Sequence, residues 1–137
     1  MKRECLFLAK PSVLNLSYSD LKSISDLDMS TAVSQANCLR NVQNLDLKGN
    51  KLTAVTSQEM FNFPSLRKID LNLNLMRHLD ENNFEFTKEL VDIDISNNQL
   101  STLLPSIFTS SKLIRLSAAN NSITSLPAQE TYSPATK

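Results

Sequence analysis

The chain has 137 residues, which is enough for one domain, and 41% of them are hydrophobic, which is enough to fill a continuous core. Fourteen basic and fourteen acidic residues give a formal net charge of zero, so no long-range field favours nucleic acid or an anionic membrane surface. The single glycine disfavours a phosphate-cradling loop, which needs backbone freedom at several adjacent positions.

Residues 1–10 are predicted to be an N-terminal segment or a partial cap. Charged residues interrupt this stretch before a signal-peptide core of about 7 apolar residues develops. No apolar run in the chain approaches the roughly 18 residues that a membrane span needs. The sequence as written therefore has no export signal and no membrane insertion, and indicates either an intracellular protein or a piece of a longer one.

A weak copy of a repeat follows, from Pro11. It consists of Leu14, Leu16, Ser19, Leu21 and Ile24. The spacing then lengthens, since Leu14 and Leu45 are separated by 31 residues whereas later copies are 24 or 23 residues apart. We predict that residues 29–36 of this insertion form a short helical turn on the back of the molecule.

Four stronger copies come next, and they share six positions. The first runs Val42-x-x-Leu45-x-Leu47-x-x-Asn50-x-Leu52-x-x-Val55, and the second runs Leu66, Ile69, Leu71, Asn74, Met76 and Leu79. The third runs Leu90, Ile93, Ile95, Asn98, Leu100 and Leu103, and the fourth runs Leu113, Leu116, Ala118, Asn121, Ile123 and Leu126. Self-similarity at a fixed period of this length is the signature of a stacked repeat architecture.

The pattern resembles the leucine-rich-repeat family, whose motif is L-x-x-L-x-L-x-x-N-x-L, and the resemblance covers Pro11 to Pro127. It implies an α/β-type solenoid: a right-handed superhelix of about five coils over residues 11–127, with a short-stranded parallel concave sheet and a mostly irregular convex side. Alternation at Leu45-x-Leu47 predicts a strand with both leucines inward. Residues 128–137 show no periodicity, so we expect a disordered tail and an uncovered core edge on the last coil.

An asparagine follows each predicted strand, where the chain turns and leaves backbone groups unpaired. The four are Asn50, Asn74, Asn98 and Asn121. The resemblance implies that they form a buried hydrogen-bonded ladder. Ligand binding is the weaker alternative, because unpaired buried polar groups are costly.

The second half of each coil indicates the subtype. Met60-x-x-Phe63-x-x-Leu66, Phe84 and Phe108 supply an apolar convex layer. With the 24-residue period, this is similar to Toll-like receptor ectodomains, insect immune repeat proteins and matrix proteoglycans. The resemblance implies a non-catalytic protein-binding module in a secreted glycoprotein or receptor ectodomain, including a role in innate immunity. The missing export signal favours the alternative, a cytoplasmic scaffold or regulatory adaptor.

Strand residues between the inward leucines should face the concave surface and form columns across the coils. One column contains Asp46, Asp70 and Asp94, and predicts a docking strip for a basic partner surface or a cation, with Tyr18 and Leu73 as apolar anchors at its edges. The alternative is a solvated strand face. The full predicted partner-binding set is Asp46, Lys48, Lys68, Asp70, Asn72, Leu73, Asp92 and Asp94. The expected partner is a protein, including another repeat protein or a second copy of this chain, and not nucleic acid.

Two further features concern modification. Cys5 and Cys38 are the only cysteines, and they could form one disulfide or remain free thiols. The sequons at Asn15 and Asn120 are candidate glycosylation sites if the chain is secreted.

Nothing in the sequence indicates catalysis. His78 is the only histidine, with no metal-binding or nucleophile motif around it. We therefore expect no enzyme activity, no cofactor and no metal.

Overall fold

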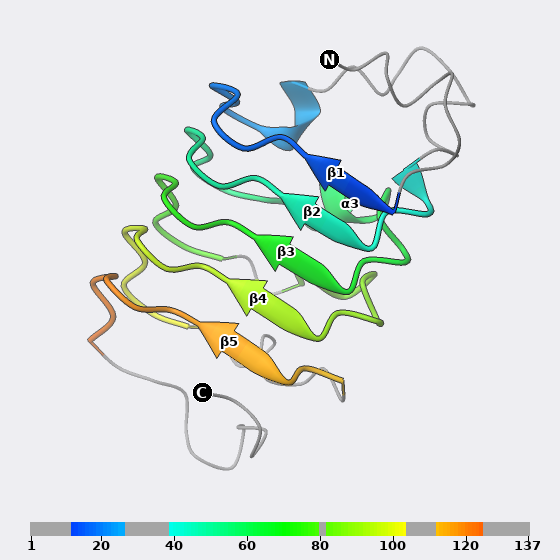
Figure 1. The fold of residues 1–137 in the computed structure, drawn as a ribbon. Coiled ribbons are helices and arrows are strands. Elements are labelled where there is room, and N and C mark those ends of the chain that lie inside the picture. The colour runs from blue at the N-terminus through cyan, green and yellow to red at the C-terminus, as the bar shows by residue number, and fades with distance from the viewer. Residues whose placement is uncertain (1–11, 27–38, 80–81, 104–111, 125–137) are drawn as a thin grey trace.

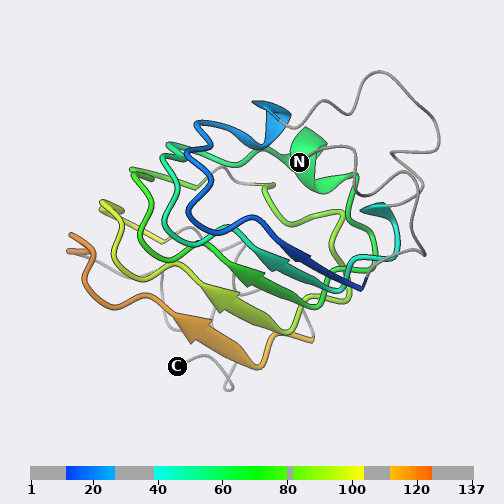
Figure 2. The ribbon, with the colours of Figure 1, turned by 45° about the horizontal axis from the view of Figure 1, so that its top comes forward.

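The computed structural model describes residues 12–26, 39–79, 82–103 and 112–124. Within these ranges, five three-residue strands form one parallel sheet in the order β1-β2-β3-β4-β5 (Figure 1). The strands are β1 (Val13–Asn15), β2 (Asn44–Asp46), β3 (Lys68–Asp70), β4 (Asp92–Asp94) and β5 (Arg115–Ser117). Each coil contributes one strand, and the return segments lie behind the sheet (Figure 2). The solenoid fold predicted from the repeat is confirmed.

The register of the sheet follows the repeat. Leu45 lies opposite Ile69 and Ile69 opposite Ile93, so the 24-residue period brings equivalent residues side by side. The same holds between Leu14 and Leu45 despite the longer spacing. The extra residues of the first coil are therefore accommodated outside the sheet.

The inward residues of each strand form the core. Leu45 and Leu47 are 2% and 0% exposed, as their alternation predicts. The strand itself begins one residue earlier than expected and ends at Asp46, yet Leu47 stays buried. A buried leucine contributes about 1.5–3 kcal/mol relative to an exposed one, so the repeated leucines are the main source of stability.

The convex side has two short regular elements among the described residues, η1 (Ile24–Asp26) and α3 (Ser57–Met60). A capping box starts α3: Thr56 Oγ1 accepts from Glu59 N at 3.1 Å, and Glu59 Oε1 accepts from Thr56 N at 3.0 Å. Phe63 is fully buried and Phe84 packs against the core. The helical turn predicted at 29–36 lies outside the described residues, as do Cys5, Cys38, Phe108 and the segments 1–10 and 128–137.

The asparagine after each strand bridges two coils. Asn74 Oδ1 accepts from Leu52 N at 3.0 Å, while Asn74 Nδ2 donates to Leu47 O and Leu71 O, each at 3.0 Å. The same bonds recur at Asn50, Asn98 and Asn121. Each amide therefore satisfies backbone groups of its own coil and of the preceding one.

The last coil differs from expectation. Its inward leucines, Leu113 and Leu116, are each only 2% exposed and belong to the same core cluster as the leucines of the earlier coils. The prediction of an uncovered core edge is wrong for these two residues. Ile123, later in the same coil, is half-buried.

Candidate functional site

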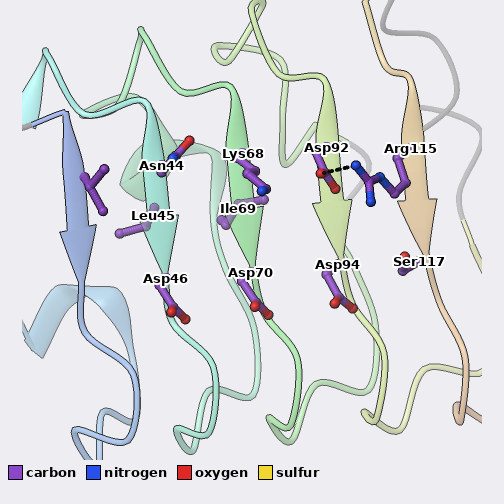
Figure 3. A pocket seen from close by; sticks show the side chains of 11 residues that line it. Asn44, Leu45, Asp46, Lys68, Ile69, Asp70, Asp92, Asp94, Arg115 and Ser117 are labelled. Atoms are coloured by element: carbon purple, nitrogen blue, oxygen red, sulfur yellow. Dashed lines mark ion pairs between the residues drawn. The ribbon is translucent and has the colours of Figure 1, made fainter.

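The outward side chains of the strands line a groove on the concave face of the sheet. Its volume is about 390 Å³. The groove crosses all five strands, and the side chains labelled in Figure 3 come from β2 to β5. The residues that line it are Val13, Asn44, Leu45, Asp46, Lys68, Ile69, Asp70, Asp92, Asp94, Arg115 and Ser117.

Three carboxylates form a column along one side of this groove. Asp46, Asp70 and Asp94 are register partners on adjacent strands, and their side chains lie side by side in Figure 3. Neighbouring strands are about 4.8 Å apart, so like charges are held close together. We call these three residues the aspartate column.

Each member of the column is fixed by a short local hydrogen bond. Asp46 Oδ1 accepts from Lys48 N at 3.0 Å, and Asp70 Oδ1 accepts from Asn72 N at 2.9 Å. Asp94 Oδ1 accepts in the same way from the N–H of Ser96 at 2.9 Å. In β1, Asn15 takes this role toward Ser17 N. The column therefore also pairs the second N–H beyond the end of each strand.

The central carboxylate, that of Asp70, has a raised pKa. Burial raises the pKa of Asp70 above its ordinary value, and the charges of Asp94 and Asp46 raise it further. The hydrogen bond from the N–H of Asn72 and the charge of Lys48 act in the opposite direction but are outweighed. A positive group brought into the groove would relieve this repulsion.

The opposite side of the groove carries compensating charges. Arg115 Nη2 lies 3.4 Å from Asp92 Oδ2, the ion pair drawn in Figure 3. Lys68 is the register neighbour of Asp92 on β3. Asp92 is thus partly neutralised, whereas Asp46 and Asp94 have no ion-pair partner within the described ranges.

Five of the eight residues predicted to bind a partner line the groove: Asp46, Lys68, Asp70, Asp92 and Asp94. The other three, Lys48, Asn72 and Leu73, lie just beyond the ends of β2 and β3 and do not line the groove. We call this part of each coil the rim. The predicted set left out six residues that line the groove: Val13, Asn44, Leu45, Ile69, Arg115 and Ser117. For Val13, Asn44 and Arg115 the available signal was their place in the column that also contains Lys68 and Asp92.

The rim has an unusual backbone. One residue of each coil has a positive φ at the equivalent position. These are Tyr18 (53°), Gly49 (72°), Leu73 (59°), Asn97 (56°) and Asn120 (57°). Tyr18 and Leu73, the predicted apolar anchors, are 66% and 44% exposed. Bulky residues rarely adopt this conformation, so the coil imposes it on them.

Side-chain amides also connect three coils along this rim. Asn97 Nδ2 donates to Asn72 Oδ1 at 2.8 Å, and Asn120 Nδ2 donates to Asn97 Oδ1 at 3.0 Å. We call this the rim amide chain. It consists of three amides joined by two hydrogen bonds, and it is separate from the buried ladder.

The described part of the chain contains neither a metal-binding cluster nor a helix that could span a membrane. No group of three or more histidine, cysteine, aspartate or glutamate side chains there could hold a metal ion. No helix in those ranges has the length and hydropathy to cross a membrane.

Residues 40–100 match the family described as leucine rich repeat. Among solved structures, the APL1 leucine-rich repeat domain aligns with 93% of this chain at a TM-score of 0.75 and 19% identity. TLR13, in its complex with ssRNA13, aligns with 76% of this chain at a TM-score of 0.65 and 21% identity. The aligned parts make up 32% and 15% of those two chains, so this chain spans a third of their length or less. No curated protein sequence matches significantly.

Proposed function

Since the chain is a leucine-rich-repeat protein, we propose that it is a non-catalytic protein-binding module whose concave groove recognises a segment with cationic side chains. The aspartate column is the observation that carries this proposal. Its carboxylates are held in place before any partner arrives, so little conformational entropy is lost when a positive group binds.

The charge balance of the groove supports a basic partner. Its lining holds four carboxylates, those of Asp46, Asp70, Asp92 and Asp94, against the two cations of Lys68 and Arg115. The raised pKa of Asp70 supports the same conclusion, because a nearby cation stabilises the ionised form. A cationic partner gains from both features, and complementary charge speeds association.

A protein partner is favoured over RNA. TLR13 was crystallised with ssRNA13, so RNA is the natural competitor among ligands. Phosphate groups would meet the excess of carboxylates in this groove, and the chain has no net positive charge to offset that. We therefore propose that the partner is a protein and not a nucleic acid.

We place the protein outside the cell, as a recognition module of the innate-immunity type. The support is the 24-residue repeat with a convex aromatic layer, which Phe63 and Phe84 supply. Recovery of the native protein with an oxidised Cys5–Cys38 pair would support this compartment. Cytosolic protein with two free thiols would instead favour an intracellular adaptor.

The groove is tested with three fluorescent probes: a lysine-alanine peptide, a glutamate-alanine peptide and a single-stranded oligoribonucleotide. We expect only the lysine peptide to bind, with an affinity that falls as salt rises. Replacing Asp46, Asp70 and Asp94 by asparagine should weaken it at least about tenfold, which is about 1.4 kcal/mol. The fold should persist, because Asn15 already makes the same turn bond in β1.

The matched control removes three carboxylates elsewhere, with Asp20→Asn, Asp26→Asn and Glu85→Gln. Its charge change is identical, but none of the three residues lines the groove. Unchanged affinity in the control supports the groove. Equal losses in both variants, or tighter binding of the oligoribonucleotide, would reject it.

A further inference from the structure

The two sequons differ sharply in how their asparagines are used. Asn15 ends β1 on the concave face and is exposed. Its Oδ1 accepts from Ser17 N at 2.9 Å and from Ser17 Oγ at 2.7 Å. Its Nδ2 has no hydrogen-bond partner within the described residues. The nitrogen to which a sugar would be attached therefore belongs to an exposed side chain and makes no hydrogen bond to another described residue.

The second sequon is built into the scaffold. Asn120 Nδ2 donates to Asn97 Oδ1, as the end of the rim amide chain, and Asn120 has a left-handed backbone. Its neighbour Asn121 belongs to the half-buried ladder. A sugar on Asn120 would attach to the nitrogen that makes the bond to Asn97, at a cost of about 0.5–1.5 kcal/mol if that bond were lost.

We propose that Asn15 is an N-glycosylation acceptor and is used in preference to Asn120. The reaction joins Asn15 Nδ2 to the anomeric carbon of a lipid-pyrophosphate-linked oligosaccharide. The bond between that carbon and the pyrophosphate oxygen breaks, the lipid pyrophosphate leaves with the electron pair, and the amide loses one proton to a base. No oxidant or reductant is involved. Because transfer competes with folding, a side chain already held by folded coils is the poorer acceptor.

A glycan on Asn15 would also affect access to the concave groove. Asn15 is the register partner of Asp46, and Val13 of the same strand lines the groove. A sugar on Asn15 would lie over the β1 end of the concave face. The rest of the aspartate column, on β3 and β4, would stay open to a partner.

The test is to express the full chain behind a secretion signal in eukaryotic cells and to measure glycan occupancy at both sequons by mass spectrometry, in total lysate and in medium. We expect occupancy at Asn15 to exceed that at Asn120 at least fivefold. Ser17→Ala should abolish the modification of Asn15. Asn120→Gln should leave it unchanged.

The matched folding control is Asn15→Asp, which removes the acceptor but keeps the turn bond that Asp46, Asp70 and Asp94 make in the other strands. It should fold and carry no sugar in the first coil. Occupancy at Asn15 equal to or below that at Asn120, or no glycan at all, would overturn the proposal. Groove binding is measured on unglycosylated bacterial protein, so either proposal can fail without the other.

Discussion

The ring of Tyr18 lies directly against Gly49 of the next coil. A Cβ atom on residue 49 would overlap the ring atoms Cδ1 and Cε1 of Tyr18. Gly49 also has a φ of 72°, in the left-handed region that side chains disfavour. Gly49, the only glycine of the sequence, is thus required for two reasons: its left-handed backbone conformation and its close contact with the Tyr18 ring.

Gly49→Ala should therefore destabilise the protein through two separable effects. The left-handed backbone costs a non-glycine residue about 1–2 kcal/mol, and the overlap with Tyr18 adds to this unless the ring moves. Urea unfolding measures the total. In a Tyr18→Ala background the loss should shrink to the backbone cost alone, so an equal loss in both backgrounds would show that the ring contact contributes nothing.

Leu73→Asn should stabilise the protein. Leu73 has a φ of 59° and is 44% exposed. Its left-handed backbone is unfavourable, and the partial burial of its side chain offsets little of that free energy. Asn97 and Asn120 occupy the same position in later coils, and asparagine tolerates this conformation well. We expect a gain of about 0.5–1 kcal/mol in unfolding free energy. A loss would mean that Leu73 packs more tightly than its exposure suggests.

The strands and the asparagine ladder were predictable because both depend on residue types that recur at one period. Leu45, Ile69, Ile93 and Leu116 are chemically alike and pair in register. The left-handed column was not predictable, because it contains Tyr18, Gly49, Leu73 and two asparagines, which share a backbone conformation and no side-chain chemistry.

The candidate site was predictable in outline only. Alternation placed Asp46, Asp70 and Asp94 on the outer face, but the sequence did not reveal that each one closes a turn onto the N–H two residues later. That bond depends on where each strand ends. The alternation predicted a strand through Leu47, but β2 ends at Asp46. This difference of one residue places Asp46 at the strand end, where its carboxylate accepts from the N–H of Lys48.

Asn74→Ala should be among the most damaging single substitutions. It leaves Leu52 N without its acceptor and removes the donors to Leu47 O and Leu71 O, in a residue only 4% exposed. An unsatisfied buried group costs about 1–3 kcal/mol, so the loss should be about 3 kcal/mol or more. Thr53→Ala, on the exposed surface, is the control for urea unfolding. A comparable small change in both variants would contradict the structural role of the ladder.

The first two coils are joined on the convex side by Glu59, which is 8% exposed. Its Oε2 accepts from Ser25 N at 3.1 Å and from Ser25 Oγ at 2.7 Å. Ser25→Ala removes only the hydroxyl bond and should cost about 1.5–3 kcal/mol, the range for a bond to a charged group. Hydrogen exchange should show faster opening of residues 12–26 than of the later coils. Uniformly faster exchange across all coils would count against a local link.

The pKa of Asp70 gives the protein a pH dependence whose sign follows from its cause. Burial, and then the charges of Asp94 and Asp46, raise the pKa of the folded carboxyl above its unfolded value. The folded state therefore binds this proton more tightly, and the contribution of Asp70 to stability falls as pH rises from the unfolded pKa through the folded one. Asp70→Asn should remove that loss while keeping the bond to the N–H of Asn72, as Asn15 does in β1.

At pH 7 we expect Asp70→Asn to be more stable than the wild type by about 0.2–1 kcal/mol, the range for like charges on adjacent strands. The difference should vanish at a pH below the unfolded pKa, where Asp70 is protonated in both states.

Asp26 supplies a control of opposite sign, because the backbone N–H groups of Lys22 and Ser23 lower its pKa. Asp26→Asn should therefore lose stability at neutral pH and converge with the wild type in acid. Chemical unfolding across this pH range measures both, and a neutral-pH loss in Asp70→Asn would mean that its charge is already compensated in the folded protein.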